Sequence, residues 1–521
     1  MTVPSTLLRN ALYRIEEIRQ IEEAAAEVLP AGSLMREAGS AAAAFVKKLI
    51  PTPNTKILVL AGPGNNGGDA LEVTQLLSAC GYELTVILCA DRIQYSEDAK
   101  QSLQRAQASK AKFIDATELP TTNEPWALVI DGLFGIGLTR AMSGTMASLI
   151  QQVNQLSQQC QFPVLALDVP SGLNADTGQL IGDIAIAIRA THTITFIGDK
   201  PGLHTAAGRD YCGHVVVANL EIPLNLFPKP SIYLCHPRMF SKALQPRMHD
   251  SHKGSNGDVL IVGGATGMIG APLLAARSAI HCGVGRVYVG FVGRAPLFDN
   301  QHPELMCRAA RDYDFSKSVV VIGPGLGDSS EAMQLLTNAL NDTTAIVIDA
   351  DALNLIATTT RLQKLLLERA ERNVATIITP HPLEAARLLG ISAQEIQSDR
   401  LKSAQSLADK FKVCAVLKGS GTIIASVNEP ICINTTGNPA LATAGTGDVL
   451  AGICGALLAQ SVPETKAARM AVWLHGLAAD NLLKQGIGPV GLTASELIPA
   501  VRTSLNKFIT DSAHDGVIEA E

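Results

Sequence analysis

Aromatic residues and long apolar runs are scarce in this chain. Aromatics make up only 4% of its 521 residues and include two tryptophans, whereas glycine occurs 44 times. This composition is typical of α/β folds, because tight strand-to-helix turns and close helix–sheet packing favour small side chains. Since no uncharged apolar run approaches the length of a membrane span, we expect no membrane association.

Closely spaced cysteine pairs of the metal-binding type and an excess of basic residues are also missing, and we expect no signal peptide. The ten cysteines are scattered and form no CxxC pair, so neither a zinc site nor a disulfide framework is indicated, and reduced, mostly buried thiols are expected. The net charge of -6 argues against a nucleic-acid partner. Charges occupy the N-terminal segment where a signal peptide would need an apolar core, which favours a cytoplasmic location.

The length of the chain predicts several domains. For 521 residues, roughly two to four domains would be typical, each large enough for its own core. Residues 222–245 lose clear periodicity and contain four prolines, which is typical of a connector that partly packs. We therefore place a boundary near Lys229, which predicts domains at residues 1–228 and 229–521.

The first half alternates apolar strands with glycine-rich turns. Residues 56–60 form a short apolar run that leads into a loop at 61–69 (AGPGNNGGD), and a helical pattern starts at Leu71. A glycine loop between a strand and a helix suits a phosphate, and asparagine carbonyls suit a cation. An ordinary tight turn is the alternative explanation. Two helices are expected before this unit, at 16–26 and 33–49, and strands after it, at 84–88, 127–130, 164–167 and 193–196.

Three carboxylates follow strands of this predicted sheet. Asp69 ends the first glycine loop, and Asp131 and Asp168 each directly follow a strand. Ligands bind at the carboxyl ends of the strands in open parallel sheets. Several acidic side chains on glycine turns at these ends therefore predict a site.

Three motifs of this half together resemble the NAD(P)HX epimerase family, namely residues 62–69 (GPGNNGGD), 168–172 (DVPSG) and Lys200 followed by Gly202 and Leu203. The resemblance implies a Rossmann-like fold and interconversion of the R and S hydrates of NADH and NADPH. It also implies three sets of ligand-binding residues. They are Asn65, Asn66, Gly67, Gly68 and Asp69 for the dinucleotide's phosphates, Gly135, Ile136, Gly137, Leu138, Thr139 and Arg140 for the substrate, and Asn66, Asp131 and Ser171 for potassium.

Asp168 is the residue that we expect nearest the chemistry. Inverting the hydrate carbon requires the hydroxyl to leave and return, or the ring to open and close, and either route needs an acid or base within reach. A carboxylate at a strand end can be tuned for this task by burial. Two residues depart from the usual motif: Ala70 replaces a glycine, and Glu72 replaces a small or apolar residue. If the turn needs a positive φ, Ala70 would strain it.

A second, larger α/β domain is predicted after the boundary. Its expected strands are mostly separated by helical patterns, as in a sheet with helices on both faces. They lie at residues 257–264, 287–290, 319–322, 345–348, 375–378 and 414–417. Polar groups collect past these strands, at 323–327 (GPGLG), 349–351 (DAD), 379–384 (TPHPLE) and 418–422 (KGSGT). A lysine on such a loop is suited to a nucleotide phosphate. Each loop alone could be a turn, but together they predict a site.

Residues 444–448 (AGTGD) run directly into an apolar helix that we expect from Val449. A helix that begins on glycines offers unpaired N–H groups and the positive end of its dipole to a phosphate. A capped, buried helix would explain Asp448 equally well. His249 and His252 lie on an earlier loop, but with no third ligand nearby the sequence favours a plain loop over a metal site there.

These motifs resemble the ribokinase-like superfamily and, within it, the ADP-dependent NAD(P)HX dehydratase family. The histidine of His381-x-x-Glu384, where kinases of the superfamily tend to have Asn-x-x-Glu, favours the dehydratase. The resemblance implies that Asp448 accepts the proton of the hydrate's hydroxyl group, which attacks the terminal phosphate of the nucleotide. It implies that ADP or ATP, with magnesium, is held by Lys418, Gly419, Ser420, Gly421, Thr422 and Gly447, and that Ala271, Gly325, His381 and Asp448 face the hydrate.

The order of the two domains is that of the bifunctional nicotinamide nucleotide repair enzyme family. The resemblance implies an α/β protein in which an N-terminal Rossmann-like domain precedes a larger ribokinase-like α/β domain. The expected partners are NADHX, NADPHX, an adenine nucleotide and further copies of the chain. Two alternatives remain open: a vitamin or sugar kinase with an accessory dinucleotide-binding domain, and a dinucleotide-binding sensor that has lost catalysis.

Overall fold

A computed structural model describes residues 10–89, 96–116, 124–182, 186–294, 296 and 298–518. The chain divides into two compact units, Met1–Ile232 and Tyr233–Glu521. The division falls within the short strand β9 (Ile232–Leu234), a few residues after the boundary at Lys229 that the sequence predicts.

The first unit is built on a parallel sheet. Its strands are in the order β4-β3-β2-β5-β6-β7-β8, and every neighbouring pair is parallel. The order reverses between β2 and β5, which is where ligands bind in such sheets. The strands are β2 (Lys56–Ala61), β3 (Glu83–Leu88), β4 (Lys112–Asp115), β5 (Trp126–Gly132), β6 (Val164–Leu167), β7 (His192–Phe196) and β8 (His214–Ala218).

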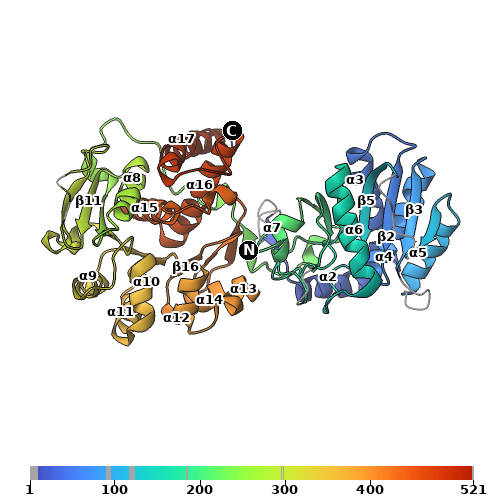
Figure 1. The fold of residues 1–521 in the computed structure, drawn as a ribbon, viewed down its shortest axis with the longest axis horizontal. Helices are drawn as coiled ribbons and strands as arrows, with labels where there is room; N and C mark the ends of the chain where they lie inside the picture. The colour runs from blue at the N-terminus through green and yellow to red at the C-terminus, as the bar shows by residue number, and fades with distance from the viewer. Residues whose placement is uncertain are drawn as a thin grey trace. The chain divides into compact units, whose positions relative to one another are not determined.

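Helices cover both faces of this sheet (Figure 1). Helix α4 packs against β2, β3 and β5, whereas Leu149 and Val153 of α6 share a core with Leu58 and Leu60 of β2. Strands that are buried on both faces read as continuous apolar runs, which is why most were predictable. The helices are α2 (Ile15–Val28), α3 (Ser33–Leu49), α4 (Asn65–Ala79), α5 (Glu97–Gln107), α6 (Gly144–Cys160) and α7 (Gly208–Tyr211).

The second unit contains a larger, mixed sheet. From β9 its strands are in the order β9-β18-β17-β16-β15-β14-β13-β10-β11-β12. All neighbouring pairs among β10 to β16 are parallel, whereas β17 pairs antiparallel with both β16 and β18. The strands are β10 (Asp258–Gly263), β11 (Arg286–Phe291), β12 (Met306–Ala309), β13 (Val319–Ile322), β14 (Ile346–Ile348), β15 (Thr376–Ile378), β16 (Cys414–Leu417), β17 (Thr422–Ala425) and β18 (Ile431–Asn434).

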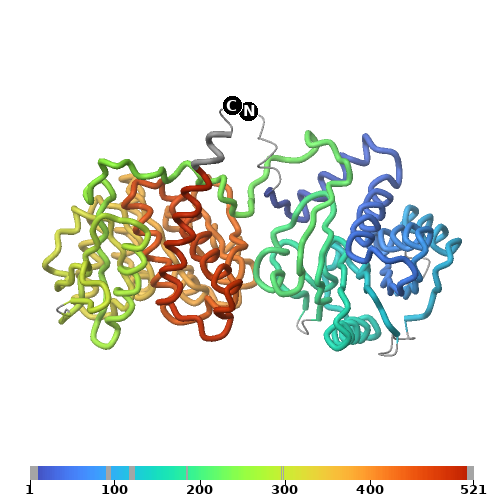
Figure 2. Tube along the Cα trace, turned by 90° about the horizontal axis from the view of Figure 1, so that it is seen from above, coloured from blue at the N-terminus to red at the C-terminus, as the bar shows by residue number. Residues whose placement is uncertain are grey.

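Two groups of helices enclose this sheet. Helices α8, α15, α16 and α17 lie on one side and α9 to α14 on the other (Figure 1), and Figure 2 shows α16 and α17 side by side. The helices are α8 (Gly270–His281), α9 (Ser330–Asn341), α10 (Ala350–Thr358), α11 (Thr360–Glu371), α12 (Pro382–Leu389), α13 (Ala393–Ser398), α14 (Arg400–Phe411), α15 (Thr446–Ala459), α16 (Glu464–Lys484) and α17 (Ala494–Ile518).

Two helices begin earlier than the sequence predicts. Helix α4 starts at Asn65 rather than Leu71, and α15 starts at Thr446 rather than Val449. In each case residues that read as a glycine loop form the first helical turn instead. Close packing explains glycines inside these helices: on α15, a Cβ at Gly452 would lie 2.1 Å from Ala275 O of α8.

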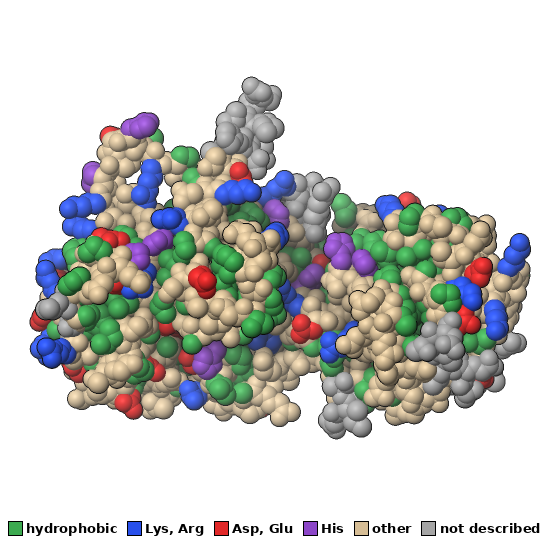
Figure 3. Space-filling model, turned by 45° about the horizontal axis from the view of Figure 1, so that its top comes forward, with side chains coloured by type: hydrophobic (Ala, Val, Ile, Leu, Met, Phe, Trp, Pro, Cys, Tyr) green, Lys and Arg blue, Asp and Glu red, His purple; other side chains and the backbone are tan. Residues whose placement is uncertain are grey.

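The cysteines and the surface agree with the composition. All ten cysteines are free thiols, and six of them are buried, as predicted. Charged side chains of both signs are interspersed on the face shown in Figure 3. In the part of the chain that the structure describes, none of the helices is both long and apolar enough to cross a membrane.

Candidate active sites

A cavity of about 640 Å³ opens at the carboxyl edge of the first unit's sheet. It lies at the switch point between β2 and β5, where the topology predicts a ligand. Its walls come from α2, α3, the start of α4, the segment after β5, and the ends of β6 and β7. The residues predicted for the epimerase that line it are Asn65, Asn66, Asp69, Gly135, Ile136, Gly137, Leu138 and Asp168.

The remaining residues predicted to bind the phosphates or the substrate do not line the cavity, and two of them are glycines that allow close packing. A Cβ on Gly67 would lie 1.9 Å from Gly62 O, and a Cβ on Gly68 would lie 2.6 Å from Met35 Cε. These two glycines let the first turn of α4 approach its neighbours. Thr139 and Arg140 are exposed and are not among the residues that line the cavity.

Asp69 lies near the start of α4, just after its first turn, and is buried. Burial raises the pKa of its carboxyl group well above the usual value, and the nearby Asp168 carboxylate raises it further. A carboxyl group that resists ionisation adds no negative charge beside a phosphate, and it can carry a proton.

Asp131 and Ser171 form a buried polar cluster at the ends of β5 and β6. The Ser171 amide donates to Asp131 Oδ2 at 2.8 Å, and Ser171 Oγ donates to Asp131 Oδ1 at 2.7 Å. Burial raises the pKa of Asp131 to about 6, although the hydrogen bonds from Ser171 oppose this. Both side-chain amide atoms of Asn66 are buried without a hydrogen-bond partner among the described residues. The amide oxygen of Asn66, which has no partner, is a hard ligand of the kind that suits a cation.

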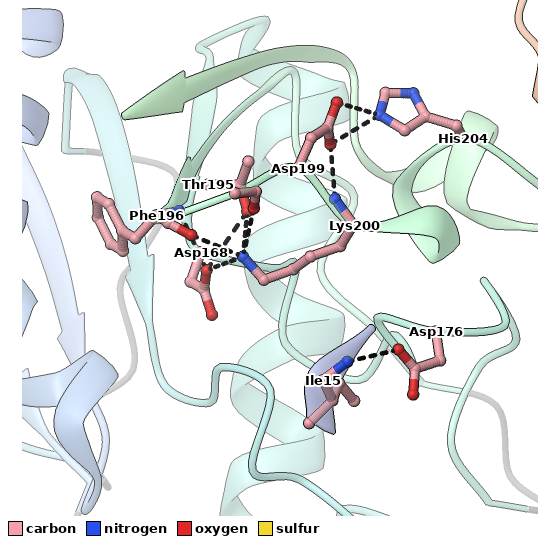
Figure 4. Close-up of polar contacts among 9 residues, drawn as sticks. Ile15, Asp168, Asp176, Thr195, Phe196, Asp199, Lys200 and His204 are labelled. Atoms are coloured by element: carbon pink, nitrogen blue, oxygen red, sulfur yellow. Dashed lines mark hydrogen bonds and ion pairs between the residues drawn. The ribbon is translucent and has the colours of Figure 1, made fainter. Parts of the chain in front are cut away.

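Asp168 is held by a fully buried lysine of the same motif, for which no role is predicted from the sequence. Lys200 Nζ donates to Asp168 Oδ1 at 2.8 Å and to Thr195 Oγ1 at 2.7 Å (Figure 4). Asp168 itself has a φ of +64°, a conformation uncommon outside glycine. Its Oδ2 lies next to Gly135, where a Cβ would come within 3.2 Å of it. Glycine there keeps this oxygen accessible from the cavity.

The two departures from the epimerase motif are accommodated structurally. Ala70 lies inside α4 and is not among the residues with positive φ, so the strain considered from the sequence does not arise. Its methyl group lies 2.5 Å from where a Cβ on Gly132 would stand, so β5 passes close beside it. Glu72 pairs with Arg105 and accepts a hydrogen bond from Ser102 Oγ at 2.6 Å; it is not among the residues that line the cavity.

The polar loops of the second unit meet at the carboxyl edge of neighbouring strands. Backbone hydrogen bonds join them: Ala265 N donates to Gly325 O at 2.7 Å, and Lys418 N donates to Pro380 O at 2.9 Å. The chain order reverses between β10 and β13, so the loops after these strands flank the switch point. Two residues predicted to face the hydrate lie there together, since a Cβ on Gly325 would be 3.4 Å from Ala271 Cβ.

Asp448 lies in the first turn of α15, and Gly445 caps the helix with a φ of +90°. Burial raises the pKa of Asp448 to about 7, and the charge of Asp349 adds to this whereas Lys418 opposes it. Lys418 Nζ pairs with Asp349 Oδ1 at 2.8 Å, and it lies 3.6 Å from where a Cβ on Gly447 would stand. The lysine therefore sits at the helix start, beside the candidate base.

His381 caps α12 and faces Glu384. Its Nδ1 accepts the amide of Leu383 at 3.1 Å, and its Nε2 lies 3.2 Å from Glu384 Oε1. Burial lowers the pKa of His381, and Lys418 lowers it further. A neutral imidazole can hydrogen-bond a substrate without adding charge.

Residues 418–421 form the tight turn of the hairpin between β16 and β17, which the sequence indicated only as a loop. The buried guanidinium of Arg400 donates to the carbonyls of Leu417 and Lys418 at 3.3 and 3.2 Å. A Cβ on Gly419 would lie 2.8 Å from that guanidinium, so this position requires glycine. The turn that carries Lys418 is thus rigidly placed.

Matches to known proteins cover both units. The NAD(P)H-hydrate dehydratase family matches residues 259–501, and the YjeF-related protein N-terminus family matches residues 31–202. The bifunctional NAD(P)H-hydrate repair enzyme Nnr of Coxiella burnetii is 38% identical over 514 residues, covering 95% of this chain and 100% of that protein. The chain belongs to this bifunctional repair enzyme family. The Escherichia coli protein of the same name is 36% identical and covers 97% of this chain and 96% of its own length.

Membership of the repair enzyme family confirms the family predicted from the motifs. It confirms a bifunctional enzyme in place of a small-molecule kinase or a sensor without catalysis, and the α/β architecture agrees with the predicted fold class. Among solved structures, an ADP/ATP-dependent NAD(P)H-hydrate dehydratase from Bacillus subtilis, co-crystallised with ATP and Mg²⁺, is 28% identical with a TM-score of 0.47, covering 53% of this chain and 98% of that one.

Proposed function

We propose that the first unit epimerises the R and S hydrates of NADH and NADPH, and that the second dehydrates the S hydrate with an adenine nucleotide. Family membership over 95% of the chain supports both activities. The observation that carries the residue assignment is that each unit has a largely buried carboxylate, Asp168 or Asp448, at the carboxyl edge of its sheet. Because ligands bind at that edge, each carboxylate is placed for acid–base chemistry.

In the second unit, Asp448 would accept the proton of the hydrate's hydroxyl group as its oxygen attacks the terminal phosphate. The amides at the start of α15 and the Lys418 ammonium would stabilise the charge that develops on the transferring group. The ring nitrogen then expels the phosphate, and loss of a ring proton restores the reduced nicotinamide. Among the described residues, no group of three or more His, Cys, Asp or Glu side chains could hold a metal ion. Magnesium would therefore enter with the nucleotide, whose phosphate charge it would neutralise.

In the first unit, Asp168 Oδ2 would exchange protons with the hydrate's hydroxyl group or with water. Asn66, Asp131 and Ser171 would hold potassium, which the unpartnered amide of Asn66 supports. The ion would supply fixed positive charge near the cavity. Asn65 and the amides at the start of α4 would receive the dinucleotide's phosphates. If Asp168→Asn still equilibrated the two hydrates at the wild-type rate, the role of Asp168 would be wrong.

The deciding experiment incubates a mixture of R and S hydrates with ADP or with ATP and follows the absorbance of the reduced nicotinamide. Full recovery of both epimers supports two activities, whereas recovery of the S form alone would mean that the first unit does not epimerise. A stable phosphorylated vitamin or sugar, with no recovery of absorbance, would support the kinase alternative instead. The homo-oligomer and the cytoplasmic location stay predictions.

A further inference from the structure

Helix α2 is tied to the loops that carry the Asp168 site. Ile15 N, at the start of α2, donates to Asp176 Oδ1 at 2.8 Å (Figure 4). Just before the helix, Tyr13 N donates to Asp199 O at 2.8 Å, and Asp199 directly precedes the buried Lys200. The match to the YjeF-related family begins at residue 31, after α2 has ended. Helix α2 is therefore held against the site by hydrogen bonds, although it lies outside the residues that the family match covers.

One face of α2 forms a wall of the cavity. Ile18, Arg19, Glu22, Glu23 and Ala26 line the same space as Asp168 and Asp69. Glu22 is half-buried, and burial raises the pKa of its carboxyl group, with the Asp168 carboxylate as the next cause. The Glu22 carboxyl group is therefore close enough to the Asp168 carboxylate, which follows β6, for their charges to interact.

Epimerisation places a demand on the site that Asp168 alone does not meet. In the route in which the hydroxyl group leaves and returns, it departs from one face of the ring and water adds to the other face. Leaving requires a proton donor and returning requires a proton acceptor, so two groups from different walls of the cavity are needed. Asp168, with Oδ1 bound by Lys200, is suited to accept a proton through Oδ2.

We propose that Glu22 is the second catalytic residue of the epimerase site and acts as the proton donor on the face of the hydrate ring opposite Asp168. The proposal rests on the epimerase activity proposed above. In the forward step, the Glu22 carboxyl group gives its proton to the hydroxyl oxygen. The C–O bond breaks, its electron pair stays on the departing water, and the ring nitrogen's lone pair forms a C=N⁺ bond.

Water then attacks the same carbon from the other face. The new C–O bond forms, the C=N electron pair returns to nitrogen, and Asp168 takes the proton of the attacking water. Glu22 is left ionised and Asp168 protonated, and exchange with solvent resets both. The same two groups with exchanged roles convert the product back, as microscopic reversibility requires.

Several charged groups face Glu22 and bear on its titration. Asp168 raises the pKa of Glu22, and Glu23 of the same helix adds to this; Lys200 and Arg19 lower it. The remaining acidic groups that line the cavity are Asp69 and Asp98. Since the donor must be protonated, the epimerisation rate should fall as the pH rises through the pKa of Glu22.

The test follows epimerisation of purified R hydrate by chromatography, without nucleotide, in the full-length protein. Glu22→Gln should lower kcat about a hundredfold, as loss of a general acid typically does, and should remove the alkaline limb of the pH profile with little change in KM. Glu22→Asp should recover part of the rate, because it restores the carboxyl group. Glu27→Gln is the matched control, since Glu27 is exposed on α2 and is not among the residues that line the cavity.

The outcomes separate a catalytic from a structural role. The proposal is wrong if Glu22→Gln keeps more than half of the wild-type kcat, if only KM changes, or if the alkaline limb persists. It is also wrong if Glu22→Asp is as slow as Glu22→Gln while thermal unfolding of both matches the wild type. Wild-type protein that leaves the R hydrate unchanged would instead overturn the proposed epimerase function itself.

Discussion

The pH dependence of dehydration offers a quantitative test of the role of Asp448. Burial and the charge of Asp349 raise the pKa of this carboxyl group from 3.8 to about 7. If the ionised form is the base, about 1% of the enzyme is active at pH 5 and about half at pH 7. We therefore expect kcat/KM for the S hydrate to rise about tenfold per pH unit below neutrality and to level off above about pH 8.

The same environment has a consequence for stability. The difference between 3.8 and about 7 corresponds to at most about 4 kcal/mol by which the fold disfavours the ionised carboxylate. Because the pKa is raised on folding, the protonated group stabilises the fold at low pH, and this contribution is lost as the pH rises toward 7. Asp448→Asn should therefore raise the unfolding temperature of the second unit at pH 8 while lowering turnover at least about a hundredfold.

The assay measures S-hydrate dehydration between pH 5 and 9 with saturating magnesium and nucleotide, and calorimetry follows unfolding in parallel. Because the terminal phosphate also titrates near neutrality, nucleotide binding is measured separately at each pH as the control. A flat rate profile from pH 5 to 8 would contradict an Asp448 base with a pKa near 7. A residual rate in Asp448→Asn within tenfold of the wild type would remove the base role altogether.

Three further outcomes are expected. Lys200→Met leaves Asp168 unpaired in a buried site, so it should abolish epimerisation and destabilise the first unit by about 3–5 kcal/mol in denaturant unfolding, whereas Lys56→Met, which removes the exposed pair with Glu124, should cost at most about 1 kcal/mol. Asn66→Leu should abolish any stimulation of epimerisation by potassium over sodium without affecting dehydration. Ala70→Gly should leave the epimerisation rate unchanged and cost about 1 kcal/mol of stability. A faster variant would contradict the conclusion that Ala70 is unstrained.

Strand positions and the edge of the sheet that carries each site were predictable. The buried strands β6, β13 and β16 are continuous apolar runs, and their observed bounds equal the predicted ones. Polar residues directly after such runs must lie at the carboxyl edge of a parallel sheet. Loops far apart in sequence, such as those of Asp349 and Lys418, could therefore be assigned to one site before their ion pair was seen.

Helix starts and side-chain roles were harder to predict. The sequence cannot distinguish glycines that form a loop from glycines that allow close packing, and Gly67 belongs to the second kind because Gly62 O occupies the space of its missing Cβ. Nothing in the sequence singles out Glu22, because charges on an amphipathic helix normally face solvent. The hydrogen bonds from Tyr13 N to Asp199 O and from Ile15 N to Asp176 Oδ1 dock α2 so that Glu22 lines the cavity.

The two sites use a lysine at a strand end in different ways, and the difference follows from their chemistry. In the first unit Lys200 is fully buried and binds Asp168 itself, which is compatible with a reaction that moves only protons and water. In the second unit Lys418 binds Asp349 and reaches the start of α15, so that its positive charge is available to a phosphate. Among the described residues Asp448 forms no ion pair, and its pKa lies near 7 as a result of burial. If Asp448 is the base, as we propose, a lysine bound to it would lower that pKa and weaken the base. The pairing of Lys418 with Asp349 avoids this and keeps the lysine charge near the start of α15.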